Sequence, residues 1–495
     1  MFALVTLALS GAKVEAQTPE LHPPVPSPPA PVPVPSGPRF ELSLADAVFI
    51  GLRDNRTVKS AYIERVSQKY DLFVAETRFV PSAILSANTA TSWQGGAAQT
   101  STNITPTATW LLPTGATFGF SWARADVRAA GASSTSDVAT LSVNQPLLKG
   151  AGLDVNMAPI RVARLQEKIN RLSLKSTVSD TVTGFVQAYR ALLQAQAQLA
   201  IAQDSLERSR SLLATNHALI DAGRMAASEI VQTEADLANQ QVAEIAAEQQ
   251  RNSAQLALLR LLAMNLRTNI VATDQLKPVH VDIDLGHAIE IALDNRMDYL
   301  SQREALEQDR QNLIVAKNNR LWNLSVTGNL QYQHSRQSGI VPLIDNTGTV
   351  AATPALPGTS GTVGLQLSIP LGDFTLAQGE VQARTTVRTA EVQLDDLQQA
   401  VEGQVRDAVQ TVDLSWRQVA AARQARVLAK ATLDIEREKL KVGRAANFEV
   451  LTFEAALRAA ETQELSAGIA YLNALTVLDQ QLGTTLDTWR ITLND

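Results

Sequence analysis

Residues 160–218 read IRVARLQEKINRLSLKSTVSDTVTGFVQAYRALLQAQAQLAIAQDSLERSRSLLATNHA, a stretch without proline. Ala, Leu, Gln and Arg are frequent in it, and this composition favours a helix. One helix of that length would span roughly 90 Å at ~1.5 Å per residue, so it needs a packing partner along its whole length. Coiled-coil packing is predicted, because apolar side chains recur near a 3.5-residue period. These side chains are Val178, Val182, Phe185, Tyr189, Leu192, Leu199, Leu206, Leu213 and Ile220.

A second stretch of this kind follows Pro370, the last proline of the chain. Its valines show heptad spacing, as at Val405, Val412 and Val419, which again predicts a long helix that packs laterally. Polar residues interrupt the apolar seam of the first stretch. Two interpretations stay open for them, side chains that face a water-filled tunnel and ordinary exposed helix faces. The interrupting residues are Gln196, Gln203, Arg210 and His217.

Both helical stretches are predicted to reverse at a glycine followed by an arginine. Gly223 precedes Arg224, and Gly443 precedes Arg444. Glycine at such a position supplies the left-handed backbone conformation that ends a helix.

The returning helices have candidate caps shortly after each turn. Ser228 and Asn447 are polar residues of the kind that cap a helix N-terminus, and a glutamate lies just after each. The sequence therefore predicts two hairpins, each made of two very long helices, over residues 155–266 and 374–483. Each hairpin should end in a small polar tip.

The two hairpins belong to two copies of one unit. LADAVFIGL at residues 44–52 recurs as LGHAIEIAL at residues 285–293, an offset of 241, and the Gly-Arg turns recur at an offset of 220. The first copy thus carries about 21 extra residues between these anchors. A repeat of this length is a tandem duplication of one structural unit and not a solenoid array. It defines repeats over residues 40–266 and 285–483, a linker over 267–284 and a tail over 484–495.

Between a short and a medium helix and the long hairpin, each unit contains strands, within residues 82–146 and 323–370. There the apolar period becomes two, as in Leu324, Val326 and Leu330, which indicates strands with one apolar and one polar face. Each strand is predicted to be about ten residues or fewer, the length needed to cross an outer membrane when tilted. Residues 129–136 and 346–361, rich in Gly, Ser, Thr and Ala, are predicted to be loops.

Alternation leaves two interpretations of these strands. One is a small soluble sandwich with its apolar faces packed inward, and the other is a membrane β-barrel with apolar side chains facing lipid. Four to six short strands cannot close alone around a water-filled lumen. Attached to helices of roughly 90 Å, they are better explained as one share of a barrel built by several copies.

The N-terminal residues are expected to be processed or extended. Residues 1–16 are read as a signal peptide that is cut after Ala16, although no Lys or Arg precedes the apolar run. A disordered apolar N-terminus is the alternative. Residues 17–39 hold about half of the 20 prolines and are predicted to be an extended spacer. The sequence has no cysteine, so we expect neither disulfides nor a lipoprotein anchor.

The composition and motifs give no indication of nucleic-acid binding, metal binding or catalysis. The net charge of −6 with 19% charged residues does not suggest a nucleic-acid binder. None of the five histidines has metal-ligand spacing, and no nucleophile elbow, P-loop or dinucleotide fingerprint occurs. We therefore expect no enzyme activity, no catalytic residue, no metal and no cofactor.

The order of these motifs resembles the TolC-like outer-membrane efflux proteins, also called outer membrane factors. The resemblance covers nearly the whole chain after the proline-rich segment. It is carried by the duplicated Leu-x-x-Ala-x-x-x-x-Leu openings at Leu44 and Leu285, the Gly-Arg turns and the ending Tyr471-Leu472-Asn473-Ala474-Leu475. It is also carried by two strand-to-helix junctions, QPLLKG around Pro146 and IPLG around Pro370.

The resemblance implies a fold that is α+β but mainly α, in a homotrimer. Each protomer would give four strands to a twelve-stranded barrel in outer-membrane lipid, continued by a helical barrel through the periplasm. Residues 267–284 and the tail would lie in an equatorial region. One departure is noted: strand-like sequence around residues 104–122, with a turn at Leu112-Pro113-Thr114-Gly115, indicates an extra hairpin or extended strands.

The function implied is an outer-membrane duct of a tripartite efflux or type I secretion system, fed by an inner-membrane pump through a periplasmic adaptor. The hairpin tips would bind the adaptor and form the gate. The alternative is a periplasmic coiled-coil scaffold, or the adaptor itself, without a membrane barrel. The tip residues are Gly223, Arg224, Ser228, Gly443, Arg444 and Asn447.

Overall fold

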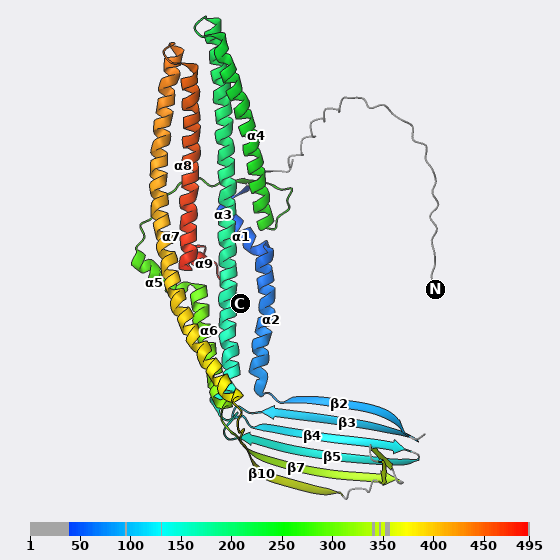
Figure 1. Ribbon diagram of the computed structural model, residues 1–495. Coiled ribbons are helices and arrows are strands. Elements are labelled where there is room, and N and C mark those ends of the chain that lie inside the picture. The colour runs from blue at the N-terminus through cyan, green and yellow to red at the C-terminus, as the bar shows by residue number, and fades with distance from the viewer. Residues whose placement is uncertain are drawn as a thin grey trace, which may run out of the picture.

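A computed structural model describes residues 39–94, 97–129, 131–338, 342–345, 348–351 and 357–493. The predicted signal peptide, and the proline-rich spacer up to residue 38, lie outside the described residues. The described chain is elongated (Figure 1): a six-stranded sheet lies at one end, and two helical hairpins extend away from it. Both hairpin tips lie at the end farthest from the sheet.

Each repeat gives a short helix, a medium helix and a hairpin, as the sequence predicts. In the first repeat these are α1 (Leu44–Asp54), α2 (Arg56–Glu76) with the 3-10 turn η1 (Thr77–Phe79), α3 (Leu153–Asp221), the 3-10 turn η2 (Ala227–Glu229) and α4 (Ile230–Leu261). In the second they are α5 (Leu285–Asn295), α6 (Met297–Asn319), α7 (Thr375–Lys441), α8 (Asn447–Leu482) and the short α9 (Thr485–Thr488).

The prediction of two very long helices per hairpin is wrong for the returning helix. α3 and α7 have 69 and 67 residues, but α4 and α8 have only 32 and 36. The remaining part of each long helix is covered by a medium helix, because α2 packs on α3 and α6 packs on both α3 and α7. Long helices are thereby covered along their length, which their stability requires.

Six antiparallel strands form the sheet, in the order β10-β7-β5-β4-β3-β2. The hairpin β3–β4 is the extra one that the sequence indicated, and it turns at Leu112–Gly115, where the Gly115 N–H donates to Leu112 O at 2.9 Å. A separate pair, β8 (Pro342–Asp345) and β9 (Gly348–Ala351), lies beyond β7. The strands of the sheet are β2 (Ser82–Gln94), β3 (Ala97–Leu111), β4 (Thr117–Ala129), β5 (Ala132–Pro146), β7 (Asn323–Ser338) and β10 (Gly358–Ser368).

Three expectations about the strands need correction. The sheet has six strands, so the four implied by the resemblance are too few. The strands have 11 to 16 residues, more than the predicted ten. Residues 132–136, 348–351 and 358–361, predicted as loops, belong to β5, β9 and β10. Their Ser, Thr, Ala and Gly content is loop-like, but each segment is paired with a neighbouring strand, β9 with β8 and the other two with β7.

Near the middle of the helices, the linker between the repeats is held by two tyrosines. β6 (Asn269–Ala272) pairs in parallel with β1 (Arg39–Leu42). The buried Tyr189 hydroxyl on α3 donates toward Asp274 Oδ2 (2.5 Å) and Leu42 O (2.9 Å). The buried Tyr471 hydroxyl on α8 donates to Val279 O (2.7 Å). The linker thus packs against both hairpins.

Candidate functional site

Both hairpins turn with the same backbone hydrogen bonds. The Gly223 N–H donates to Ile220 O at 2.8 Å, and the Arg224 N–H donates to Leu219 O at 2.8 Å. The second turn repeats this pattern from Gly443 and Arg444, at 2.9 and 2.8 Å. The two glycines have φ of 67° and 74°, the left-handed conformation that the sequence predicts for them.

The predicted caps are wrong. Ser228 lies inside the 3-10 turn η2, and no side chain caps α4. Asn447 is the first residue of α8, whose N-cap is Ala446. Glu449 serves this helix end instead, because its carboxylate accepts the Ala446 N–H at 3.0 Å. A carboxylate in the first turn also complements the helix dipole.

Asn447 has a different role, since its side chain joins the two hairpins. It is 2% exposed and accepts from Asn216 Nδ2 of α3 at 2.8 Å. Thr233 of α4 accepts from Asn216 at 2.8 Å and from Asn447 at 3.0 Å. All three side chains are buried, where hydrogen bonds must compensate lost hydration. The tips are therefore linked by a polar contact inside one protomer.

The two arginines of the tips are exposed. Arg224 reaches the other tip, because a Cβ placed on Gly443 would lie 3.8 Å from Arg224 Nη2. Neither Arg224 nor Arg444 has an ion-pair partner among the described side chains. Phe448, four residues after Arg444, is 66% exposed and was not predicted as a tip residue. In the described part of the chain, the tips thus offer two arginines without ion-pair partners and one exposed aromatic side chain.

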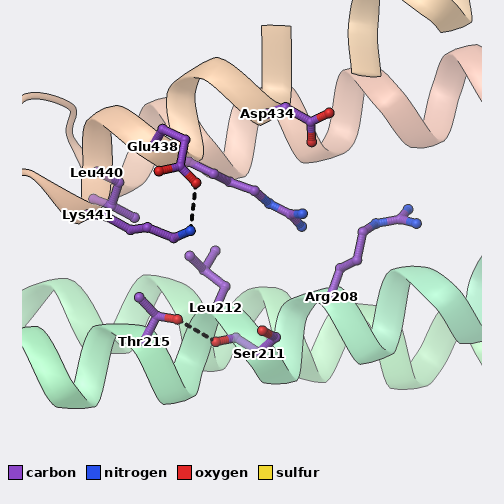
Figure 2. A pocket seen from close by; sticks show the side chains of 9 residues that line it. Arg208, Ser211, Leu212, Thr215, Asp434, Glu438, Leu440 and Lys441 are labelled. Atoms are coloured by element: carbon purple, nitrogen blue, oxygen red, sulfur yellow. Dashed lines mark hydrogen bonds and ion pairs between the residues drawn. The ribbon is translucent and has the colours of Figure 1, made fainter. Parts of the chain in front are cut away.

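Below the tips, ion pairs connect three helices. Glu454 of α8 accepts from Arg208 of α3 at 3.1 Å and also pairs with Arg437 of α7. A pocket of about 340 Å³ lies between α3 and α7 (Figure 2), where Lys441 pairs with Glu438 at 2.6 Å. Because its charges of both signs are largely paired, this polar pocket is part of the contact between hairpins.

At the opposite end, Pro146 and Pro370 lie where strands lead into the long helices. Pro146 is the last residue of β5, and Pro370 lies two positions after Ser368, the last residue of β10. Glycines with positive φ follow both prolines, Gly150 at 82° and Gly372 at 76°. Shortly after the second junction Glu380 accepts from Arg320, the C-cap residue of α6, at 2.9 Å, a bond that holds the pKa of Glu380 below its ordinary value. The junctions thus bend the chain and tie it to the neighbouring helix.

In its half nearer the helices, the sheet has one apolar and one polar face. Residues that pair directly across strands lie on the same face. One row across β4, β5 and β7 is Phe120, Leu141 and Leu330, whose exposed fractions are 48%, 47% and 50%. The neighbouring row on the other face ends in Ile84 on β2 and is polar from β3 to β10, where it reads Thr107, Ser121, Thr140, Gln331 and Ser360. A broad exposed apolar face of this kind marks an interaction surface.

Within the described residues, no three His, Cys, Asp or Glu side chains lie close enough together to hold a metal ion. None of the described helices has the length and hydropathy of a membrane span. Of the residues that interrupt the seam of α3, Gln203, Arg210 and His217 are exposed, and Gln196 is half-buried and accepts the Ala272 N–H at 3.2 Å.

Comparisons with known proteins match both repeats. The sequence profile of the family described as outer membrane efflux protein matches residues 52–264 and 288–484. No curated protein matches the chain. Several outer-membrane proteins of known structure share its fold, and three of them are described next.

The CmeC outer membrane channel of Campylobacter jejuni has 16% sequence identity and a TM-score of 0.65, over 89% of this chain and 86% of that one. The outer membrane protein VceC of Vibrio cholerae has 15% identity and a TM-score of 0.65, over 89% and 96%. The MtrE outer membrane channel of Neisseria gonorrhoeae has 16% identity and a TM-score of 0.65, over 90% and 89%. At these identities the likeness shows the fold alone.

Proposed function

Because the chain belongs to the outer membrane efflux protein family, a family of transport proteins and not of enzymes, we propose that it is the outer-membrane duct of a tripartite efflux or type I secretion system. It passes substrates from an inner-membrane pump and a periplasmic adaptor to the cell exterior. The resemblance to TolC-like proteins seen in the sequence is confirmed by the family match. The pump, the adaptor and the direction of transport are part of the proposal.

The observation that carries the proposal is the separation of the apolar sheet face from the polar hairpin tips. The sheet presents exposed apolar side chains such as Leu365 (69%) and Val363 (87%). The tips lie at the other end of α3, whose 69 residues span about 100 Å. The sheet suits outer-membrane lipid, and the helices are long enough to extend far into the periplasm.

A homotrimer is supported by the unpartnered sides of the protomer. α2 packs on α3 with one face, and its other face exposes Ile63 (72%), Val66 (72%) and Tyr70 (65%) at helical spacing. On the other side of the protomer α7 exposes Val381 and Val392. One protomer does not surround a lumen, whereas three copies packed side by side do so with these surfaces buried.

The hairpin tips are the proposed adaptor-binding and gate region, formed by Gly223, Arg224, Ser228, Gly443 and Arg444. Asn447 lies beneath this surface and holds the two tips together. An adaptor that binds the open arrangement of the tips more tightly than the closed one shifts the population toward the open duct. The exposed arginines are the contacts best suited to a carboxylate-bearing partner.

The alternative, a periplasmic scaffold or adaptor without a membrane barrel, makes the sheet dispensable for membrane association. Deletion of residues 323–370 removes β7 and β10, and we expect the variant to leave the outer-membrane fraction. Deletion of residues 342–351 is the matched control, because it removes only the separate β8–β9 pair. Wild-type protein in the soluble periplasmic fraction, or membrane-bound protein after the larger deletion, contradicts the duct.

A further inference from the structure

We propose that three copies of this chain build an eighteen-stranded β-barrel. In the wall of this barrel, the β2 edge of one copy pairs with the β10 edge of the next. The inference rests on the proposed trimeric duct. It departs from the twelve strands that the family resemblance implies, because each copy supplies six strands.

Both edges of the sheet lack the features that normally prevent edge-to-edge pairing. β2 reads SAILSANTATSWQ and β10 reads GTSGTVGLQLS, with no proline and no charged residue in either. Edge strands of monomeric proteins are kept apart by short length, charges, proline or a covering element. Here the strands have 13 and 11 residues, and no described strand covers their outer sides. Such edges are suited to pairing.

The two edges of one copy are not partners for each other. They lie on opposite sides of the sheet (Figure 1), and closing six strands leaves too little interior for a lumen. Every neighbouring pair in the sheet is antiparallel, so after six strands β2 and β10 run in opposite directions. Copies placed side by side thus continue the antiparallel ladder, which an odd number of strands would break.

The faces of the two edges also agree. Leu85 on β2, and Leu365 on β10, lie on the same face as Phe120 and Leu141, because cross-strand pairs keep the face through the whole register. In the half of the sheet nearer the helices, joining the copies therefore continues the apolar face as one outside surface and the polar face as one inside surface. Lipid on one side and water on the other require this arrangement in a membrane wall. Farther from the helices, the outside carries the ion-paired Arg124, Asp126 and Asp137.

The extra hairpin β3–β4 is built into the wall and is not an appended loop. Its turn packs on the junction after β5, because the Gly152 N–H donates to Thr114 O at 3.1 Å. A Cβ on Gly115 would lie 2.2 Å from Gly150 O, so only glycine permits this approach. Trp110 on β3 donates from Nε1 to Phe79 O at 2.9 Å, next to the end of α2.

The consequence is a wider outlet. Barrel diameter grows roughly linearly with strand number, so eighteen strands give about 1.5 times the diameter of twelve, and walls of 16 to 18 strands leave an aqueous channel. The wall of this duct therefore admits substrates of larger cross-section than a twelve-stranded one.

Electron microscopy of the detergent-extracted protein tests the strand number directly. We expect three-fold particles whose wall resolves eighteen strands, with β3 and β4 in the wall. A three-fold particle with twelve strands in the wall overturns this inference and leaves the proposed duct intact. Particles without three-fold symmetry overturn the duct as well.

Cross-linking tests which edges of the sheet meet. Because the chain has no native cysteine, only the introduced cysteines react with the cross-linker. In Asn88→Cys/Gln366→Cys, both thiols lie on the polar face of the edge strands. With a flexible bismaleimide we expect covalent dimers and trimers on a denaturing gel. The control Ser121→Cys/Thr140→Cys pairs adjacent β4 and β5 within one chain, so its product keeps the mobility of a monomer. A trimer that exports substrate yet gives no interchain product from the edge pair contradicts the joined edges.

Discussion

Gly51 of the first repeat and Ala292 of the second occupy equivalent places, and the side chains that they face differ in a compensating way. A Cβ on Gly51 would lie 2.5 Å from Phe185 Cε2, so the aromatic ring requires glycine there. In the second repeat Ala292 packs in a cluster with Val405, the residue 220 positions after Phe185. All four residues are buried. In the first repeat a glycine on the short helix faces a large side chain on the long helix, whereas in the second repeat an alanine faces a valine. The contact between the short and the long helix is kept in both.

The strands of the two repeats differ much more. The first repeat supplies β2 to β5 to the sheet, and the second supplies only β7 and β10. The helices tolerate little change because each long helix must be covered along its length. A sheet accepts an added hairpin such as β3–β4 between two existing strands, because two more strands preserve the alternation of direction. The duplication is therefore still recognisable in the helices, whereas it is not recognisable in the sheet.

The largest expected effect concerns the two tips. Arg224→Glu together with Arg444→Glu should abolish export without preventing trimer assembly, because both exposed cations of the proposed adaptor surface are reversed. Each single variant measures how far the tips are equivalent, since only Arg224 is known to approach the opposite turn. Export of a reporter substrate is measured beside the size of the extracted oligomer.

The control for the tips is Arg224→Lys with Arg444→Lys, which keeps the charge and should retain most export. Full export by the variant with both glutamate substitutions would show that these arginines are not part of the proposed site, whatever export the two single variants show.

A smaller effect is expected when the buried pair Gly51–Phe185 is replaced by the alanine and valine that occupy the equivalent places in the second repeat. Gly51→Ala alone forces the ring of Phe185 aside and should cost about 1–3 kcal/mol. Phe185→Val alone leaves a cavity and should cost about 2–3 kcal/mol, less than the ~3–5 of a Phe→Ala change. The double variant reproduces the pair of the second repeat, so we expect it to recover about 1–2 kcal/mol of the summed cost.

Thermal unfolding at one fixed protein concentration measures these differences, since stability of an oligomer depends on concentration. The reverse exchange, Ala292→Gly with Val405→Phe, is the matched test in the second repeat. Strictly additive costs in both cycles would mean that the two contacts are not equivalent.

The smallest effect compares the two tyrosines of the linker. Tyr189→Phe should cost about 2 kcal/mol and Tyr471→Phe about 1 kcal/mol, because only the Tyr189 hydroxyl bonds to a carboxylate. Burial, and then the hydrogen bond to Asp274, raises the pKa of Tyr189 from 10.0 to about 12. The stabilisation from this raised pKa is complete below pH 10 and is lost as the pH rises to about 12.

The advantage of wild type over Tyr189→Phe should therefore shrink between pH 10 and about 12. Urea unfolding at pH 8 and at several values above pH 10 measures it. A difference that stays constant over this range would show that the hydroxyl does not contribute through its ionisation.

The candidate site was predictable in part. The left-handed glycines at 223 and 443 follow from local chemistry, since a helix reversal of this kind favours glycine in any fold. The helix caps could not be predicted in the same way. Ser228 and Asn447 are residue types that cap helices, but whether either one does so depends on the residue at which the helix starts. Asn447 is instead buried against Asn216, which is 231 residues away in the chain. Such distant pairing leaves no local signal.

The sequence by itself determined the periodic features of this protein, the long helices, the two-residue period of the strands and the tandem duplication. Periodicity is local, because each helical or extended segment repeats its own pattern of burial. Only the tertiary structure decided how far α4 and α8 run, that residues 132–136 extend β5, and that the sheet has six strands. These outcomes depend on partners that lie far away in the chain, and Ser- and Thr-rich segments become strands only when a neighbouring backbone pairs with them.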